Sequence, residues 1–158
     1  FSGTGSTNQP LGLYDTPGVT TKSFGAALPT HSELTDMIHK LVDANGDLST
    51  SRFLIHSSDF AKLLDQQVTT NGGATTVSYE GGQYRVAGVP VHQSTAATEG
   101  KFVLADMSKI NLIYYGPAHL LADGFSGGKS TYGTTELIVM NWLDSALTDP
   151  ATIVIGSS

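Results

Sequence analysis

An α+β fold with a mixed β-sheet and two main helices is predicted, because the helical patterns come early in the chain and the strand patterns come late. Regular alternation of strands and helices would instead indicate an α/β fold. A length of 158 residues favours one domain, and a hydrophobic content of 39% is sufficient for a folded core. The sequence has no internal repeat.

The first helix is predicted to begin after Thr30 or Ser32, either of which is a suitable N-cap. Apolar residues then recur with the spacing of one helical face, at Leu34, Met37, Ile38 and Leu41. The helix should end within residues 43–47, where Gly46 suits a left-handed terminator.

A second helix is predicted after a short β-prone run at residues 52–56, with Ser57 or Ser58 as its cap. The residues that follow are strand-like and are separated by glycine-rich turns. The predicted strands cover residues 76–79, 84–87, 89–92, 101–105, 111–115, 134–147 and 152–155.

Composition and charge exclude several classes of function. The net charge of −6, with Lys and Arg scattered along the chain, argues against a dedicated nucleic-acid binder. The absence of cysteine excludes disulfides, zinc–thiolate sites and cysteine nucleophiles. No stretch approaches the roughly 20 apolar residues of a membrane span. Only 14% of the residues are charged, which suits extensive contact with other chains.

Two glycine-rich stretches look like phosphate-binding loops but lack required residues. In GTGSTNQPLG, which begins at Gly3, Asn8 replaces the third glycine of the dinucleotide-binding pattern, and no helix follows. The stretch DGFSGGKS ends like a P-loop, but Asp123 stands where that pattern needs glycine. We therefore predict no cofactor.

Two further clusters of polar residues leave alternatives open. His56, Asp59 and a neighbouring serine are the residue types of a hydrolase, although sequence neighbours do not define a catalytic triad. Three oxygen-bearing side chains at alternate positions suggest a calcium-stabilised binding module, namely Asp43, Asn45 and Asp47. Leu48 and Leu54 occupy the places where a calcium loop needs Gly and Glu, so we predict no metal.

Six segments, taken in order, carry a more specific resemblance. The first reads GTGSTNQPLGL and is similar to a G-x-G-x-x-x-P-x-G-[IL] motif, and RVAGVPV is similar to an L-x-G-x-P-V motif. The six segments are Gly3–Leu13, Glu33–Leu41, Ser51–Asp65, Arg85–Val91, Phe102–Ser108 and Pro150–Ile155. Together they resemble the major capsid proteins of tailed phages and prophages that have the Hong Kong 97-type fold.

The resemblance implies a structural subunit of an icosahedral shell and no enzyme activity. Copies of the subunit would assemble into pentamers and hexamers that enclose DNA without binding it specifically, with no membrane partner. Its location would be the virion capsid, assembled in the cytoplasm of a bacterial host.

The resemblance also implies a domain organisation. Residues 1–29 would cross between the peripheral and axial domains, residues 30–133 would form an axial-domain-like core, and residues 134–158 would return toward the peripheral domain. Family members usually begin with an arm, an extended loop and a spine helix. We therefore expect this chain to be a C-terminal half, monomeric or weakly associated by itself, and we expect no isopeptide crosslinking.

Individual residues receive shape and contact roles from the same resemblance. Four residues would shape the crossing, namely Gly3, Gly5, Pro10 and Gly12, while Gly88 and Pro90 would set the turn into a core strand. Two loops are candidate contacts between subunits. Their residues are Asp43, Asn45 and Asp47 in the first and Gly127, Gly128 and Lys129 in the second.

Overall fold

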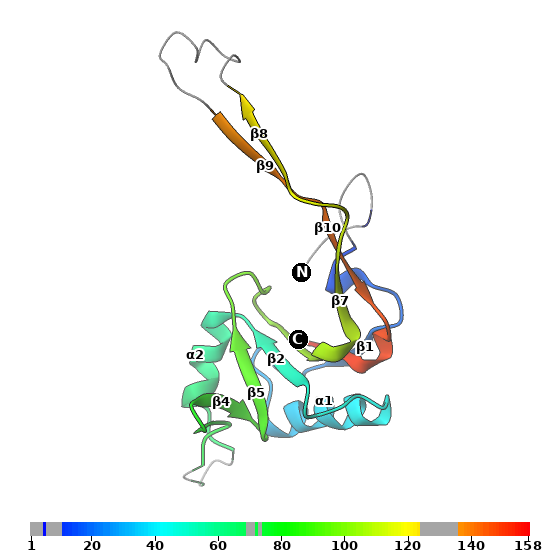
Figure 1. Cartoon of the computed structure of the whole chain (residues 1–158). Helices are drawn as coiled ribbons and strands as arrows, with labels where there is room; N and C mark the ends of the chain where they lie inside the picture. The colour runs from blue at the N-terminus through cyan, green and yellow to red at the C-terminus, as the bar shows by residue number, and fades with distance from the viewer. Residues whose placement is uncertain (1–4, 6–10, 69–71, 73, 124–135) are drawn as a thin grey trace. The chain divides into compact units, whose positions relative to one another are not determined.

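The described residues form two compact units in the computed structural model (Figure 1). It describes residues 5, 11–68, 72, 74–123 and 136–158. The first unit comprises residues 1–110 and 147–158, and the second comprises residues 111–146. The predicted α+β class is confirmed. None of the helices in the described part of the chain is long and apolar enough to cross a membrane.

The first unit is built on a seven-stranded mixed sheet with the strand order β1-β11-β6-β2-β5-β4-β3. Two neighbouring pairs, β1 with β11 and β2 with β5, are parallel, and the other pairs are antiparallel. The strands are β1 (Thr20–Ser23), β2 (Ser51–Ile55), β3 (Val77–Glu80), β4 (Gln83–Val86), β5 (Val89–Gln93), β6 (Lys101–Asp106) and β11 (Ile153–Ser157). Short 3₁₀ turns lie at η1 (Leu13–Asp15), η2 (Met107–Lys109) and η4 (Pro150–Thr152).

The first helix, α1 (His31–Asp43), begins with a capping box. The Thr30 hydroxyl accepts a hydrogen bond from the Glu33 amide at 3.3 Å, and the Glu33 carboxylate accepts one from the Thr30 amide at 2.8 Å. The backbone N–H groups of Thr30 and then Gly25 lower the pKa of Glu33. Thr30 is therefore the cap, as one of the two predicted alternatives had it.

The end of α1 differs from the prediction for Gly46. The left-handed residue is Asn45, with φ of 62°, so the role predicted for Gly46 is wrong. Glycine is needed at position 46 for a different reason: a Cβ there would lie 2.5 Å from Cδ2 of Leu41. The Gly46 amide also donates to the Leu41 carbonyl at 2.9 Å, so the chain passes very close to the buried end of the helix.

The second helix, α2 (Ser57–Asp65), begins one residue earlier than predicted. Its N-cap is His56, whose Nδ1 accepts from the Ser58 amide at 3.2 Å, so the prediction of a serine cap is wrong. The Ser58 hydroxyl donates instead to Glu99, outside the helix. A histidine ring reaches the amide of the second helical residue as a serine oxygen would.

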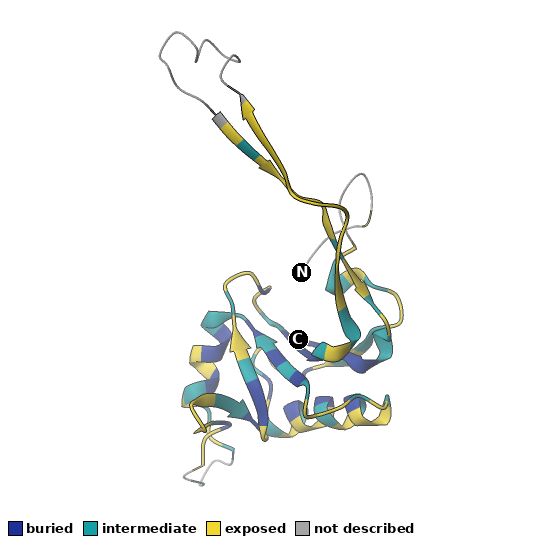
Figure 2. Ribbon diagram, viewed as in Figure 1, coloured by how far each residue is buried: buried dark blue, intermediate teal, exposed yellow. Residues whose placement is uncertain are grey.

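Both helices pack on one face of the sheet. Their buried residues contact those of the central strands in a single core cluster, made of Leu34, Met37, Leu41, Phe53, Ile55, Phe60, Leu63, Phe102, Leu104 and Val154 among others. Figure 2 shows the inward faces of α1 and α2 as buried. A smaller cluster lies on the opposite face, where Val103, Ala105, Ile153 and Ile155 meet residues from η1 and from the η2 turn. The sheet is thus apolar on both faces at its centre.

A buried carboxylate, Asp106, holds the end of β6. Its oxygens accept from the Thr50 hydroxyl at 2.5 Å and the Asp47 amide at 3.1 Å. They also accept from the Ser108 hydroxyl at 2.7 Å and the Ser108 amide at 3.0 Å. Burial alone would raise the pKa of Asp106, but these hydrogen bonds outweigh burial and lower the pKa to about 2.

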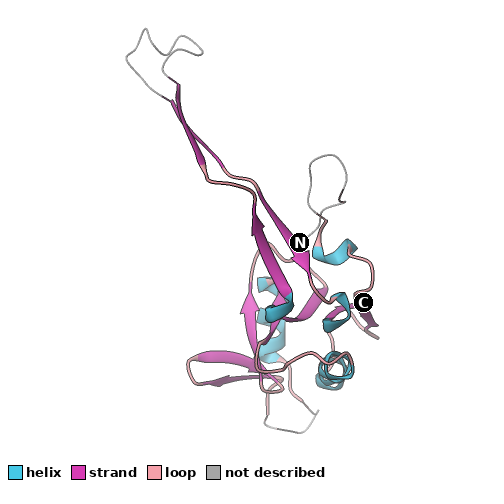
Figure 3. Cartoon of the chain, turned by 45° about the vertical axis from the view of Figure 1, so that its right-hand side comes forward, coloured by secondary structure: helices cyan, strands magenta, loops and turns pink. Residues whose placement is uncertain are grey.

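The second unit is a two-stranded ribbon that includes most of β7 (Ile110–Tyr114) and β10 (Leu143–Leu147), and all of β8 (His119–Asp123) and β9 (Glu136–Met140). β7 pairs with β10, and β8 pairs antiparallel with β9, so the two pairs follow one another along the chain (Figure 3). β8 lies before position 133 and β9 after it, so these two paired strands come from the two sides of the boundary that the resemblance implies at that position. The single long strand predicted at residues 134–147 is in fact two strands, because the ladder is interrupted at Asn141 and Trp142.

The interruption has a cause in the sequence of the facing strand. Tyr115 donates to the carbonyl of Trp142, and the next paired residues are His119 and Met140. Three residues, Gly116–Ala118, therefore face the single residue Asn141. Gly116 has a φ of 81°, and Pro117 has no N–H to donate, so this segment bulges out of the ladder.

Replacing Gly46 with alanine tests the close approach at the end of α1. The variant Gly46→Ala should lose about 1–3 kcal/mol of unfolding free energy, because the new methyl group overlaps the immobile side chain of Leu41. Chemical denaturation measures this loss. Gly25→Ala is the matched control, since a Cβ there meets its nearest atom at 3.7 Å. Equal stability of the two variants would contradict the prediction.

The Asp106 network predicts a specific pH dependence. Because its pKa falls from 3.8 in the unfolded chain to about 2 in the folded chain, its stabilising contribution is complete above pH 3.8. That contribution is lost as the pH falls from 3.8 through 2. Asp106→Asn should cost about 1–3 kcal/mol at neutral pH and flatten the loss between pH 4 and 2. Unfolding curves at several pH values measure both effects, with exposed Asp15→Asn as the control that should change neither.

Candidate assembly surface

The ribbon of the second unit exposes an unusual number of large apolar side chains. Here "apolar ribbon" means residues 111–123 and 136–146. Figure 2 colours this ribbon almost entirely as exposed. Its exposed members are Leu112, Ile113, Tyr114, Tyr115, Leu120, Leu121, Leu137, Val139, Met140, Trp142 and Leu143. A contiguous apolar surface of this kind marks a contact site rather than ordinary scatter of single residues.

The apolar residues of β8 and β9 lie on both faces of the ribbon. The register pairs Leu120 with Val139 and Ala122 with Leu137 on one face, which we call the aliphatic face. The other face carries the pairs His119–Met140 and Leu121–Ile138 and, at its end, the positions of the acidic pair Asp123–Glu136. Strands with one face in water alternate apolar and polar residues, whereas strands covered on both faces have continuous apolar runs. The ribbon has the pattern of a strand pair that is covered on both faces.

The charge of the ribbon limits what it can contact. Between residues 111 and 146 the acidic residues are Asp123, Glu136 and Asp144, and the only Lys or Arg is Lys129. Binding to nucleic acid or to an anionic lipid surface depends on clustered basic side chains. The ribbon is therefore suited to a partner that is apolar and not strongly acidic, such as another protein surface.

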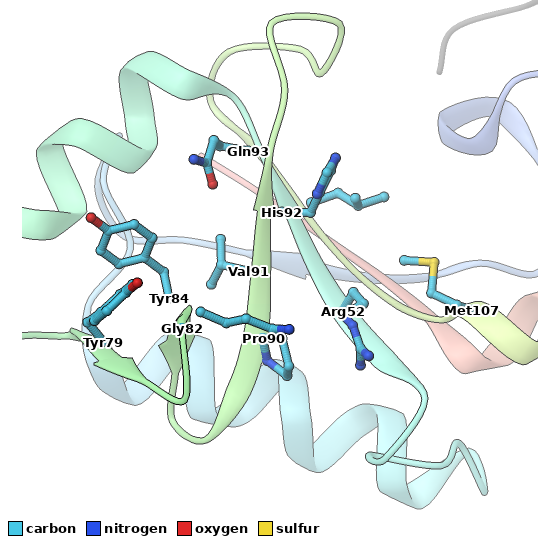
Figure 4. Close-up of a pocket in the computed structure, with 11 residues that line it drawn as sticks. Arg52, Tyr79, Gly82, Tyr84, Pro90, Val91, His92, Gln93 and Met107 are labelled. Carbon is cyan, nitrogen blue, oxygen red and sulfur yellow. The ribbon is translucent and has the colours of Figure 1, made fainter.

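The first unit has a groove that is lined mainly by residues of β2, β4 and β5 (Figure 4). Arg52 and Leu54 of β2 alternate with Phe53 and Ile55, which belong to the core beneath the helices, so Arg52 and Leu54 lie on the other face of the strand. The groove has a volume of about 770 Å³ and is lined by Arg52, Leu54, Tyr79, Gly82, Gln83, Tyr84, Pro90, Val91, His92, Gln93 and Met107. We did not predict this groove, although alternation along residues 51–55 is visible in the sequence.

The carboxylates of the loop predicted to contact other subunits after α1 make local contacts. Asp43 lies 3.0 Å from His39, and Asp47 accepts from the Ser49 amide at 2.8 Å. In the described residues, no three His, Asp or Glu side chains gather as a metal site. The local bonds of these carboxylates account for their presence in a turn that ends a helix. Their role in subunit contact stays a prediction.

The second predicted contact loop, with Gly127, Gly128 and Lys129, lies outside the described residues, as do Gly3 and Pro10. Gly5 has a φ of 67°. The Gly12 carbonyl caps η1 by accepting from the Asp15 amide at 3.1 Å.

The predicted turn into a core strand lies between β4 and β5. Ala87 and Gly88 form its two central residues, with φ of 48° and 84°. Both angles are positive, as in the tight hairpin turn whose twist matches that of the flanking strands. Pro90 follows in β5, buried and facing Arg85. The shape roles predicted for these residues stay predictions.

The residues of the hydrolase alternative have structural partners. His56 Nδ1 lies 2.9 Å from the Ser58 hydroxyl, and that hydroxyl donates to Glu99. The serine thus lies between the histidine and the acid, whereas a triad needs the histidine between the other two. Asp59 accepts from the Gly100 amide at 2.7 Å and from Lys62 at 2.9 Å. Burial would raise the pKa of Asp59, but the Gly100 and Lys62 bonds outweigh it and lower the pKa.

Comparison with solved structures gives consistent matches at low identity. The capsid of an empty GTA particle has 16% identity and a TM-score of 0.66, over 96% of this chain and 57% of that one. The holo-SrpI encapsulin complex from Synechococcus elongatus PCC 7942 has 16% identity and a TM-score of 0.64, over 93% and 56%. A virus-like particle from Pyrococcus furiosus has 15% identity and a TM-score of 0.61, over 92% and 58%.

These matches confirm the predicted Hong Kong 97-type fold. The chain spans a little over half the length of each of the three chains. Comparison of the sequence with curated proteins gives no significant match.

The sequence also matches a protein family, which adds evidence of common ancestry to the similarity in fold. The sequence matches the Phage capsid family over residues 1–158. Members of that family are structural proteins. Because the match covers the whole chain and the fold agrees with it, this chain belongs to the phage capsid family.

Proposed function

We propose that the chain is part of the major capsid protein of a phage or prophage and acts as a structural subunit of an icosahedral shell. Copies assemble into pentamers and hexamers, and the shell encloses DNA. The virion capsid is its location, after assembly in the cytoplasm of a bacterial host. The observation that carries this proposal is the match to the Phage capsid family over residues 1–158. The apolar ribbon supports it, because its exposed side chains offer a surface for contact with protein.

The composition supports contact among many copies. A surface with few charges loses little hydration energy when it is covered, because fewer ions must leave water. Rings of five or six subunits need two different contact surfaces on each copy. The apolar ribbon supplies one such surface, and the loops at residues 43–47 and 127–129 are proposed to supply others.

The charge balance supports enclosure of DNA without specific binding. The net charge is −6, and the sequence has no cluster of basic residues that could neutralise phosphates.

We also propose the domain assignment that the resemblance implies. Residues 30–133 belong to an axial domain, and residues 1–29 and 134–158 connect it to a peripheral domain.

Assembly of the complete gene product tests the proposal directly. Expressed in bacteria, the complete protein should form closed particles that electron microscopy resolves and that sediment far ahead of the free subunit. The isolated 158-residue chain is the comparison, and it should elute from size-exclusion chromatography as a monomer or weak oligomer. A complete protein that stays monomeric at every concentration would contradict the proposed function.

DNA binding provides a separate test. The isolated chain should not retard duplex DNA in a gel-shift assay at about 150 mM salt, because its net charge opposes non-specific binding. Raising the net charge by Asp36→Lys and Asp43→Lys, at exposed positions of α1, tests the electrostatic cause and should increase any retention. Tight retention by the unmodified chain would show that the chain binds DNA directly and would contradict the prediction.

A further inference from the structure

Strand β5 has a registered neighbour on only one side along its second half. On the β2 side, the register runs through Val91, His92 and Gln93. On the β4 side, it ends at the pair Arg85–Pro90, although β5 continues to Gln93. Within the described chain, the backbone of residues 91–93 therefore faces no paired strand on that side. An unpaired strand edge of this kind is a template for the addition of another strand.

The groove in the first unit opens along this edge (Figure 4). Its wall away from β5 is the end of the β3–β4 hairpin, where Gly82, Gln83 and Tyr84 line it. Because the hairpin closes that wall, the groove has room for one extended segment but not for a strand that brings its own neighbour. Its volume of about 770 Å³ is within the range of ligand sites in proteins.

One side of the groove is suited to a carboxylate. His92 is opposite Leu54 in the register, so His92 and Arg52 lie on the same face of the sheet. Within the described residues, only Nη1 of Arg52 donates, to the Ser49 and Ser51 carbonyls at 3.3 and 2.7 Å, which leaves Nε and Nη2 for a ligand. None of the described lining residues is acidic, although the chain has a net charge of −6. The groove therefore favours an acidic partner.

The other side of the groove offers an aromatic surface toward α2. The Tyr84 ring packs on Phe60 with 5.1 Å between centroids, and the Tyr79 ring packs on Tyr84 with 5.0 Å, both edge to face. Tyr79 is nevertheless 65% exposed, so it is free to contact a ligand. Side chains of an extended strand point alternately to the two faces of a sheet. A segment in which acidic and apolar residues alternate would therefore match both sides of the groove.

We propose that this groove binds an extended segment of a separate protein, which adds as a strand to residues 91–93 of β5 and places an acidic side chain at Arg52. The strands of the described chain that carry acidic residues already pair with a neighbour, and the groove has no room for that neighbour. A separate protein with an unpaired acidic segment is thus the partner that fits. This binding role goes beyond the proposed function and does not depend on it.

Two synthetic peptides test the chemistry of the site in the 158-residue chain. The probe is Thr-Val-Glu-Val-Glu-Val-Thr, and the matched peptide has lysine in place of both glutamates. The glutamate peptide should bind with a Kd below about 1 mM, and the lysine peptide should bind at least about tenfold more weakly. Fluorescence anisotropy of the labelled peptides measures both. Equal binding of the two peptides, or no binding of the glutamate peptide, would overturn the proposal.

A charge substitution locates the carboxylate contact. Arg52→Gln should weaken binding of the glutamate peptide on the order of tenfold and leave binding of the lysine peptide no weaker. Lys40→Gln is the matched control, because it makes the same change in net charge on α1, outside the groove lining. An equal effect of the two substitutions would show that only net charge attracts the peptide, and it would overturn the assignment of Arg52.

Backbone pairing is tested without any substitution in the protein. Two further peptides carry N-methyl groups, one on its valines and the other on its glutamates, so that each lacks the N–H groups along one edge. At least one of them should bind about tenfold more weakly than the parent peptide. Saturation with the parent peptide should also slow hydrogen exchange of the Gln93 amide at least about tenfold. Unchanged binding of both methylated peptides, or unchanged exchange at Gln93, would overturn strand addition.

The complete gene product identifies the source of the segment. Its free subunits and its particles should both bind the glutamate peptide, because a separate protein fills the groove. A groove that is blocked already in the free subunit would assign it to a segment of the same polypeptide, and a groove blocked only in particles would assign it to a second copy. Either result would overturn the proposal and leave the capsid function intact. Failure of the gene product to form particles would overturn the capsid function alone, since peptide binding to the subunit would still decide the proposal.

Discussion

The first unit depends on burial of β6 on both of its faces. Phe102 and Leu104 contact the core beneath the helices, while Val103 and Ala105 contact the smaller cluster on the other side. A strand buried in this way has no face for water and must be covered by neighbours on every side. The antiparallel partners β2 and β11 flank it, and the two helices dock on the sheet that these three strands form. Asp106 then ends the strand by binding donors from two separate turns.

The second unit differs from the first in burial. Its strands are apolar, but little of the described chain covers them. Most of its large side chains face solvent on both sides of the ribbon. An isolated strand pair is marginal in water, so such a ribbon gains its stability from whatever covers it. This dependence links the structure to assembly. The first unit has its own core, whereas the described part of the ribbon leaves its large apolar side chains exposed.

Sequence reasoning predicted the helices, most strands and the fold family well. The spacing of Leu34, Met37 and Leu41 indicated a buried helical face, and all three are fully buried. It was less successful where two local signals competed. Serines at the start of α2 suggested a cap, but the imidazole of His56 is the cap. The Ser58 hydroxyl instead donates a hydrogen bond to the carboxylate of Glu99, 41 residues away. The groove at Arg52 and the break between β9 and β10 were missed, because both arise from which strands become neighbours.

The sequence by itself determined the local elements and, through six ordered motifs, the family. These properties follow from residue spacing, caps and turns, which act over a few residues. Only the tertiary structure showed that Gly46 is required by contact with Leu41, that Asp106 joins two turns, and that the ribbon is apolar on both faces. Those features depend on strand register and on contacts between residues far apart in the chain, and neither is encoded in any short stretch.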